Sequence, residues 1–140
     1  MVDRETIVRR LTLLEEYYTD LDEARQKLSW EKFERDKVVR RYIERTLHMA
    51  IEACLDIANH IIAYEGYREP IDNKDAFQVL YEQGILKEGL TENLKKMAQF
   101  RNVIVHDYIR VQPEIVFTIL QRNQGDILEF ANIIKEKFLG

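Results

Sequence analysis

Apolar side chains recur at helical spacing along nearly the whole chain. In the first segment they follow one another at steps of four, three, four, three and seven residues: Ile7, Leu11, Leu14, Tyr18, Leu21 and Leu28. Asp3 precedes this stripe in the position of a helix N-cap, with Glu5 in the first turn. The pattern predicts an amphipathic helix that starts at Asp3 and has a coiled-coil-like seam.

A second, long helix is expected from Ser29 to about Tyr64, because nothing breaks the pattern before Gly66. Its first half is rich in charged residues. Its second half, Thr46 to Ala63, is apolar on several sides, so we expect it to be buried against more than one neighbour. The segment 67–73 contains a proline and is expected to be a loop.

Three further helices are expected in the second half of the chain. A short one covers about 74–83 and stops at Gly84, because glycine can adopt the left-handed conformation that ends many helices. Thr91 is expected to cap the next helix, and Pro113 fits the first turn of the last one. Gly125 is expected to kink that last helix or split it in two.

Five helices joined by short loops predict an all-α fold, an antiparallel four/five-helix bundle formed as one domain over residues 1–140. A length of 140 residues is enough for one hydrophobic core. The 21 basic and 25 acidic residues give a net charge of −4, which excludes a strongly basic nucleic-acid arm and a polybasic membrane anchor. The single cysteine excludes a disulfide framework and a cysteine-based zinc site.

Membrane spans, targeting segments and the common catalytic motifs are missing from the sequence. No apolar run approaches the ~20 residues that cross a bilayer, and the first residues lack an apolar signal segment. We therefore expect a cytoplasmic protein with no membrane partner. The P-loop, GxGxxG, GxSxG and HExxH motifs are also missing, which excludes the corresponding NTPase, dehydrogenase and hydrolase classes.

A charged residue interrupts the apolar stripe of the fourth expected helix. The stripe is Leu94, Met97, Arg101, Ile104 and Tyr108, at steps of three and four. A buried guanidinium stays charged, so Arg101 needs a carboxylate or a shared cavity, unless it extends to the rim of the bundle. His106 follows about 140° round the helix, on the polar side with Asn102. A lone histidine at a helix edge is usually a surface residue.

Titratable residues form a second polar strip, on the apolar half of the long helix. His48, Glu52, Asp56 and His60 recur at steps of four, with Asn59 beside them. The strip could ligate zinc or iron, although the fourth helix offers only His106 as a further ligand. Asp56 could instead pair with Arg101. A hydrated seam between helices and a partly wet interface with a second copy of the chain are the other interpretations.

Basic residues cluster at the start of the same long helix. Residues 35–45 hold five basic and two acidic side chains, a local net charge of +3. Lys37, Arg41 and Arg45 align at i, i+4 and i+8, a spacing that could follow a phosphate backbone. Such a run is more often simply a solvated helix face.

The segment from Arg101 to Tyr108, Arg-Asn-Val-Ile-Val-His-Asp-Tyr, resembles the R-x4-H-x-Y motif of the HepT-like branch of the HEPN superfamily. The stretch that contains Asp56, Asn59 and His60 resembles the polar patch of that branch and supplies supporting residues. The resemblance extends to helix order and motif position over nearly the whole chain. It implies a helical homodimer in which two R-x4-H motifs line one cleft, and a metal-independent endoribonuclease without a cofactor.

This resemblance implies a role for each motif residue. His106 would be the general acid/base, and Arg101 would stabilise the charge that builds on the phosphate. Asn102 would donate to a phosphate or sugar, and Asp56 would orient Arg101. The residue types suit RNA cleavage by the adjacent 2′-hydroxyl, because histidine exchanges protons near neutral pH and arginine binds phosphate oxygens. A dimer supplies the second histidine that such a mechanism uses.

The resemblance also implies a partner. Members of this branch are typically toxins encoded beside MntA-like antitoxins, which have a nucleotidyltransferase fold and transfer AMP to the motif tyrosine. We therefore expect the toxin of a type VII-like toxin–antitoxin pair, with RNA as substrate and Tyr108 as the modified residue (O-AMP-tyrosine). Helical spacing places Tyr108 nearly above Arg101, at the mouth of the cleft, with its hydroxyl toward solvent; the alternative is an ordinary core tyrosine.

Two other functions stay open from the sequence. The chain could be a non-catalytic helical subunit that presents a substrate or nucleotide to a partner nucleotidyltransferase. It could also be a structural bundle with a metal site on the long helix.

Overall fold

The computed structural model describes residues 3–140, and these form helices without a β-strand, which confirms the all-α prediction. Seven α-helices follow one another: α1 (Arg4–Lys27), α2 (Trp30–Arg35), α3 (Lys37–Glu65), α4 (Asn73–Glu82), α5 (Glu88–His106), α6 (Pro113–Arg122) and α7 (Gln124–Ile134). A short 3₁₀ turn, η1 (Tyr108–Arg110), separates α5 from α6, and a π-helical turn, η2 (Lys135–Leu139), follows α7.

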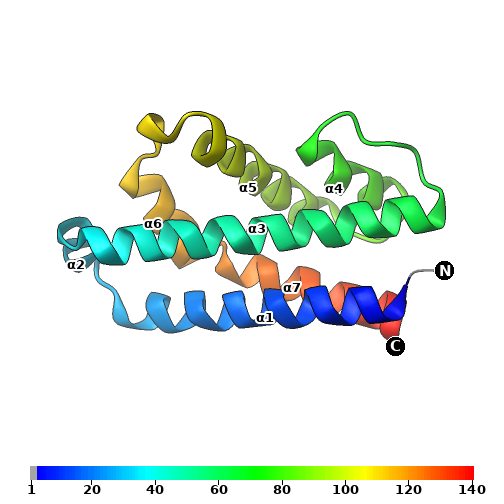
Figure 1. Ribbon diagram of the computed structural model, residues 1–140, viewed down its shortest axis with the longest axis horizontal. Helices are drawn as coiled ribbons and strands as arrows, with labels where there is room; N and C mark the ends of the chain where they lie inside the picture. The colour runs from blue at the N-terminus through cyan, green and yellow to red at the C-terminus, as the bar shows by residue number, and fades with distance from the viewer. Residues whose placement is uncertain (1–2) are drawn as a thin grey trace.

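The long helix α3 is the axis of an antiparallel bundle (Figure 1). Helix α1 runs antiparallel along one side of α3, and α4 and α5 pack on the other side. Helix α7 returns beside α1, so that the start of α1 and the end of α7 lie at the same end of the bundle. There, Nη1 of Arg4 donates to the carbonyl oxygen of Leu139 at 3.0 Å.

The core lies where α3 meets α1, α5 and α7. Helix α3 contributes buried residues from Ile43 to Ile62, on most of its circumference, which confirms the prediction that its second half packs against several neighbours. The rings of Phe77 and Phe130 meet edge to face in this core. Cys54 is buried as well, at 2% exposure, and burial raises the pKa of its thiol.

The long second helix is not continuous, so the prediction of one helix from Ser29 to Tyr64 is wrong. The chain leaves helical geometry at Asp36, where φ is −96° and ψ is 97°. The Asp36 carboxylate accepts from the backbone amides of Val38 and Val39, both at 3.1 Å, and so caps a new helix. Phe33 anchors the short α2 against the bundle. The break places Lys37 at the first position of α3.

The predicted caps have different outcomes. Asp3 and Ser29 are N-caps as predicted, whereas Thr91 is not. Helix α5 begins one turn earlier, and the hydroxyl of the buried Thr91 donates to the Lys87 carbonyl at 2.7 Å. Gly84 has a φ of 74° and ends α4 as predicted. The last helix does split in two, at Asn123.

None of the helices over residues 3–140 is long and apolar enough to cross a membrane. The assignment of residues 1–140 to one domain stays a prediction, and its first two residues lie outside the described part of the chain.

Candidate active site

Arg101 points from α5 to α3 and meets a carboxylate there. Its Nε donates to Oε1 of Glu52, and its Nη1 donates to Oδ1 of Asn102 at 3.1 Å. The Arg101 side chain is 20% exposed, and that of Glu52 is 35% exposed. The prediction that Arg101 needs a carboxylate is therefore confirmed, because a half-buried guanidinium keeps its charge and has to be paired. The pair fixes the guanidinium while leaving part of it open to solvent.

Asp56 is not the partner of Arg101, so that prediction is wrong. Its Oδ2 lies 3.1 Å from Nη1 of Arg10 on α1. Glu52 and Asp56 are four residues apart on α3, and four residues turn a helix by about 40° past one full turn. That drift carries Asp56 toward α1, whereas Glu52 faces α5.

His48 and Arg45 extend this cluster along α3. Nε2 of His48 lies 3.6 Å from Oε1 of Glu52, and Nη1 of Arg45 lies 3.4 Å from Nδ1 of His48. Burial lowers the pKa of His48, and the nearby cations Arg45 and Arg101 lower it further, against an opposing effect of Glu52. The lowered pKa favours the neutral form of His48. The four-residue spacing singled out His48 and Glu52, yet neither was predicted as a site residue.

Asn102 connects the arginine to the start of α4. Its Oδ1 accepts from Arg101 and also from Nδ2 of Asn73, at 3.3 Å. Asn73 and the exposed Asn59 of α3 line one cavity of about 540 Å³. Of the predicted residues, Asn102 thus contacts Arg101 directly. Asn59 lies in the cavity that Asn73, the other partner of Asn102, also lines. Sequence spacing could not find Asn73, because it lies on another helix.

His106 is the last residue of α5 and is exposed. Among residues 3–140 its side chain has no hydrogen-bond or ion-pair partner. Arg101 and His106 are five residues apart, which puts their side chains about 140° apart around the helix. The fold therefore carries the two motif side chains on the last two turns of α5, on different sides of the helix, and does not bring them into contact.

Tyr108 lies beyond the helix rather than on it. Helix α5 ends at His106, and the backbone of Asp107 turns away with φ −148° and ψ 56°. The helical arithmetic that placed Tyr108 above Arg101 therefore does not hold. Tyr108 begins η1 and is 56% exposed, so the alternative of an ordinary core tyrosine is wrong. It lines a pocket with Lys37 and Arg41 at the start of α3.

The four-step strip on α3 does not stay together. His60 stacks on Tyr64, with ring centroids 4.6 Å apart, and its Nε2 is buried without a hydrogen-bond partner. Asp56 pairs with α1, and His48 and Glu52 turn toward Arg101. Over residues 3–140, no group of three histidine, cysteine or acidic side chains is arranged to hold a metal ion. The strip therefore provides no ligand cluster of the kind that the metal-site interpretation requires.

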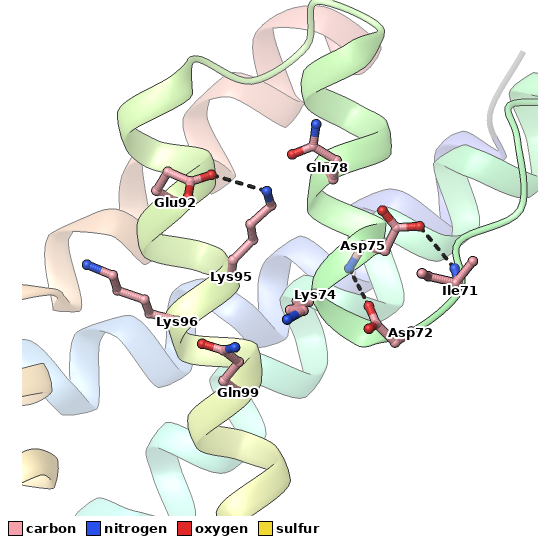
Figure 2. A pocket seen from close by; sticks show the side chains of 9 residues that line it. All are labelled: Ile71, Asp72, Lys74, Asp75, Gln78, Glu92, Lys95, Lys96 and Gln99. Atoms are coloured by element: carbon pink, nitrogen blue, oxygen red, sulfur yellow. Dashed lines mark hydrogen bonds and ion pairs between the residues drawn. The ribbon is translucent and has the colours of Figure 1, made fainter.

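A polar groove lies between α4 and α5 (Figure 2). Its volume is about 350 Å³, and Lys95, Lys96 and Gln99 line it from α5. Lys95 forms an ion pair with Glu92 across 3.1 Å. Gln99 precedes Asn102 and His106 at steps of three and four, so this groove lies along the polar side of α5 that leads to the motif.

A model of the ribonuclease HepT-like family matches residues 14–134. The chain belongs to this family. It is 34% identical over 104 residues to the mRNA nuclease HepT of Shewanella oneidensis, a match that covers 74% of this chain and 78% of the relative. It is 31% identical over 74 residues to the tRNA nuclease HepT of Aphanizomenon flos-aquae, covering 53% and 50% of the two chains.

Solved structures of other proteins have the same fold. A tri-AMPylated HEPN toxin of Shewanella oneidensis, in complex with an MNT antitoxin, superposes with a TM-score of 0.87 at 27% identity, over 96% of this chain and all of that one. The YutE protein of Bacillus subtilis superposes with a TM-score of 0.85 over 96% and 90% of the chains, and at 22% identity it shows the fold alone. The HepT-like resemblance of the motif is thereby confirmed for the family and the fold.

Proposed function

We propose that this chain is a metal-independent endoribonuclease and the toxin of a type VII-like toxin–antitoxin pair. One observation carries the proposal: a half-buried Arg101, held by Glu52 and Asn102, stands five residues before an exposed His106 at the end of α5. Related chains are named as mRNA and tRNA nucleases, which supports RNA as the substrate class.

The proposed reaction needs only protein side chains and the RNA itself. His106 takes the proton of the 2′-hydroxyl, whose oxygen attacks the adjacent phosphorus. The bond from phosphorus to the 5′-oxygen breaks, and that oxygen takes a proton from a second acid. The products are a 2′,3′-cyclic phosphate and a free 5′-hydroxyl. Arg101 stabilises the charge on the phosphate oxygens, and Asn102 donates to the phosphate or sugar.

The second acid is His106 of another copy in a homodimer. Among residues 3–140 of one chain, the side chain of His106 has no hydrogen-bond or ion-pair partner, and one chain offers no second histidine for the acid role. We assign the interface to the exposed strip of α3, with Asp56 and Asn59, and to the end of α5. His60 supports this strip from within α3 by stacking on Tyr64. Such an interface needs to bury at least ~1,000 Å², and sedimentation as a monomer at micromolar concentration would contradict it.

The proposed partner is an MNT-type nucleotidyltransferase that acts as antitoxin. A related toxin was solved in a tri-AMPylated state in complex with an MNT antitoxin. In this chain the exposed Tyr108 hydroxyl is the acceptor that would receive AMP from ATP. A nucleotide there adds negative phosphate two residues from His106, which repels RNA and fills the entrance to the site. We place the pair in the cytoplasm.

Cleavage of single-stranded RNA by the purified protein in EDTA tests the enzyme. Arg101→Ala and His106→Ala should each slow cleavage by ~100-fold or more, because they remove the charge stabiliser and the base. Arg122→Ala, at the exposed end of α6, is the matched control and should cleave at the wild-type rate. Full activity in His106→Ala, or loss of activity in EDTA alone, would contradict the mechanism.

A non-catalytic nucleotide-presenting subunit is the second candidate, favoured by the same exposed Tyr108. It predicts that the wild-type protein leaves RNA intact while it still binds nucleotide together with its partner. The product ends decide between the two, since only the enzyme produces 2′,3′-cyclic phosphate.

A further inference from the structure

A basic pocket lies where the start of α3 meets the turn after α5. Its volume is about 370 Å³. Lys37, Arg40, Arg41 and Glu44 line it from α3, and Tyr108 and Ile109 line it from η1. Figure 1 shows the first turns of α3 and the segment after α5 at the same end of the bundle. The pocket is separate from the contacts of Arg101, and its basic residues have no role in the proposed reaction.

The charge of this pocket is opposite to that of the whole chain. Three cations and one carboxylate line it, whereas the chain has a net charge of −4. Over residues 3–140, Lys37 and Arg41 form no ion pair and no side-chain hydrogen bond. Arg40 donates to the carbonyl of Glu34. Burial raises the pKa of Glu44, and the nearby Arg40 and Arg41 oppose this shift. The cations of the pocket outnumber this single carboxylate.

The wall opposite the cations is apolar and open to solvent. Tyr108 is 56% exposed and Ile109 is 95% exposed. An exposed ring beside unpaired cations is the combination that single-stranded nucleic acids use, because bases stack on the ring while phosphates meet the cations. An ordinary solvated helix face offers the cations without the apolar platform.

The pocket is aligned with the candidate active site along α3. Lys37, Arg41 and Arg45 follow one another on one face, and Arg45 contacts His48 beside Glu52. From Arg41 to Glu52 the helix rises about 16 Å, at 1.5 Å per residue. A strand that passes through the pocket therefore meets Arg101 at a different phosphate.

We propose that this pocket is a phosphate subsite that holds the backbone of the RNA substrate at a phosphate other than the one that Arg101 binds. Lys37 and Arg41 bind the phosphate, and Tyr108 with Ile109 supports a neighbouring base. The proposal rests on the proposed ribonuclease function. It also gives the nucleotidylation of Tyr108 a second effect, since a nucleotide on that residue occupies the RNA path itself.

Binding of a labelled single-stranded RNA at several salt concentrations tests the subsite. The experiment uses full-length protein with His106→Ala, so that the RNA stays intact, and adds the double change Lys37→Ala and Arg41→Ala. The plot of log affinity against log salt should become shallower by roughly 1.4, about 0.7 for each lost phosphate contact. The matched control, Lys32→Ala with Arg35→Ala, removes the same charge from α2 outside the pocket and should keep the original slope.

Cleavage kinetics give a second readout. With His106 restored, the Lys37/Arg41 variant should raise KM on long RNA, and this penalty should grow with RNA length, because only longer strands reach the pocket. An unchanged salt slope, or an equal penalty on a dinucleotide and on long RNA, overturns the subsite. If the slope is unchanged and AMP transfer to Tyr108 slows, the pocket binds the nucleotide donor, which also overturns it. Absence of cleavage by the wild type contradicts the proposed function, whereas the binding slope still decides the subsite.

Discussion

The loop before α4 and the turn after α5 lie at opposite ends of the bundle, and arginines behave differently in each (Figure 1). In the loop, Arg68 donates to Asp75 at 2.7 and 2.9 Å and to Glu82 at 2.8 and 2.9 Å. Asp75 also accepts from the backbone amide of Ile71 at 3.0 Å. These contacts tie the loop to α4 and engage all three nitrogen atoms of the guanidinium.

At the other end, Lys37 and Arg41 have no such partners among residues 3–140, and Tyr108 and Ile109 are exposed beside them. The residue types are similar, but the pairing differs. Where charges are satisfied inside the chain, they maintain the structure. Where they are left unsatisfied next to exposed apolar groups, they are available to a ligand.

Tyr108→Phe should have the largest effect, because it removes the only oxygen of this side chain that can accept a nucleotide. Incubation with the MNT-type partner and ATP should add AMP-sized mass to the wild type and none to the variant. The variant should therefore stay toxic in the presence of the partner. Since Tyr108 is exposed, folding should be unchanged. Intact mass spectrometry and a melting curve measure both effects. Equal mass gain in the two proteins would place the modification elsewhere.

Glu52→Gln should reduce RNA cleavage by about 10- to 100-fold, because it removes the charge that holds Arg101 in place. Glu52 acts through Arg101, so kcat should fall more than KM rises. Glu52→Asp should recover part of the rate, since it restores the charge. Asp56→Asn, one turn further along α3, removes an ion pair with Arg10 instead. Its cleavage rate should fall much less than that of Glu52→Gln. Equal losses in Glu52→Gln and Asp56→Asn would mean that the pairing is not what orients Arg101.

Arg68→Ala should lower the melting temperature and leave RNA cleavage at the wild-type rate, because its contacts hold only the loop and α4. Arg110→Ala provides the control at the other end. Its ion pair with Asp107 is more exposed, at 81% for the arginine side chain, so its loss should not change the melting temperature. Identical melting curves for Arg68→Ala and the wild type would remove the contrast between the two ends.

Acid should weaken the contacts between Arg68 and Asp75, at the end of the bundle that holds the loop before α4, in a narrow pH range. The hydrogen bonds from Arg68 lower the pKa of Asp75 from 3.8 to about 2. Because the folded pKa lies below the unfolded one, the contribution of Asp75 to stability is complete above pH 3.8 and is lost as the pH falls toward 2. The free energy of unfolding, measured with urea across this pH range, should depend less on pH in Arg68→Ala than in the wild type. A dependence of equal size in both would contradict the assignment.

The fold could be predicted largely because local signals dominate in a helical bundle. The stripe after Asp3 and the left-handed Gly84 act within one or two turns, and both were identified. Two errors came from residues with two possible uses. Asp36 was counted as part of a charged helix face, yet its carboxylate caps α3. Thr91 was assigned as a cap, yet its hydroxyl bonds back to Lys87 inside the helix.

The site was predictable in type but not in pairing. A guanidinium in an apolar stripe requires a carboxylate, and that requirement held for Arg101. Spacing alone could not choose between Glu52 and Asp56, because both lie on one strip and only the rotation of α3 against α5 separates them. Asn73 and the basic pocket depend on contacts between distant segments, so no pattern within one helix could reveal them.

The burial of Cys54 has a practical consequence for measuring distances in this protein. Its thiol keeps its proton and is closed to solvent, so thiol-reactive dyes should not label it in the folded state. A cysteine introduced in place of the exposed Ile109 would then carry the single dye of each molecule. Cys54 would not have to be replaced beforehand. Energy transfer between dyes on two copies would report how far apart their η1 turns lie, in the free protein and with RNA bound.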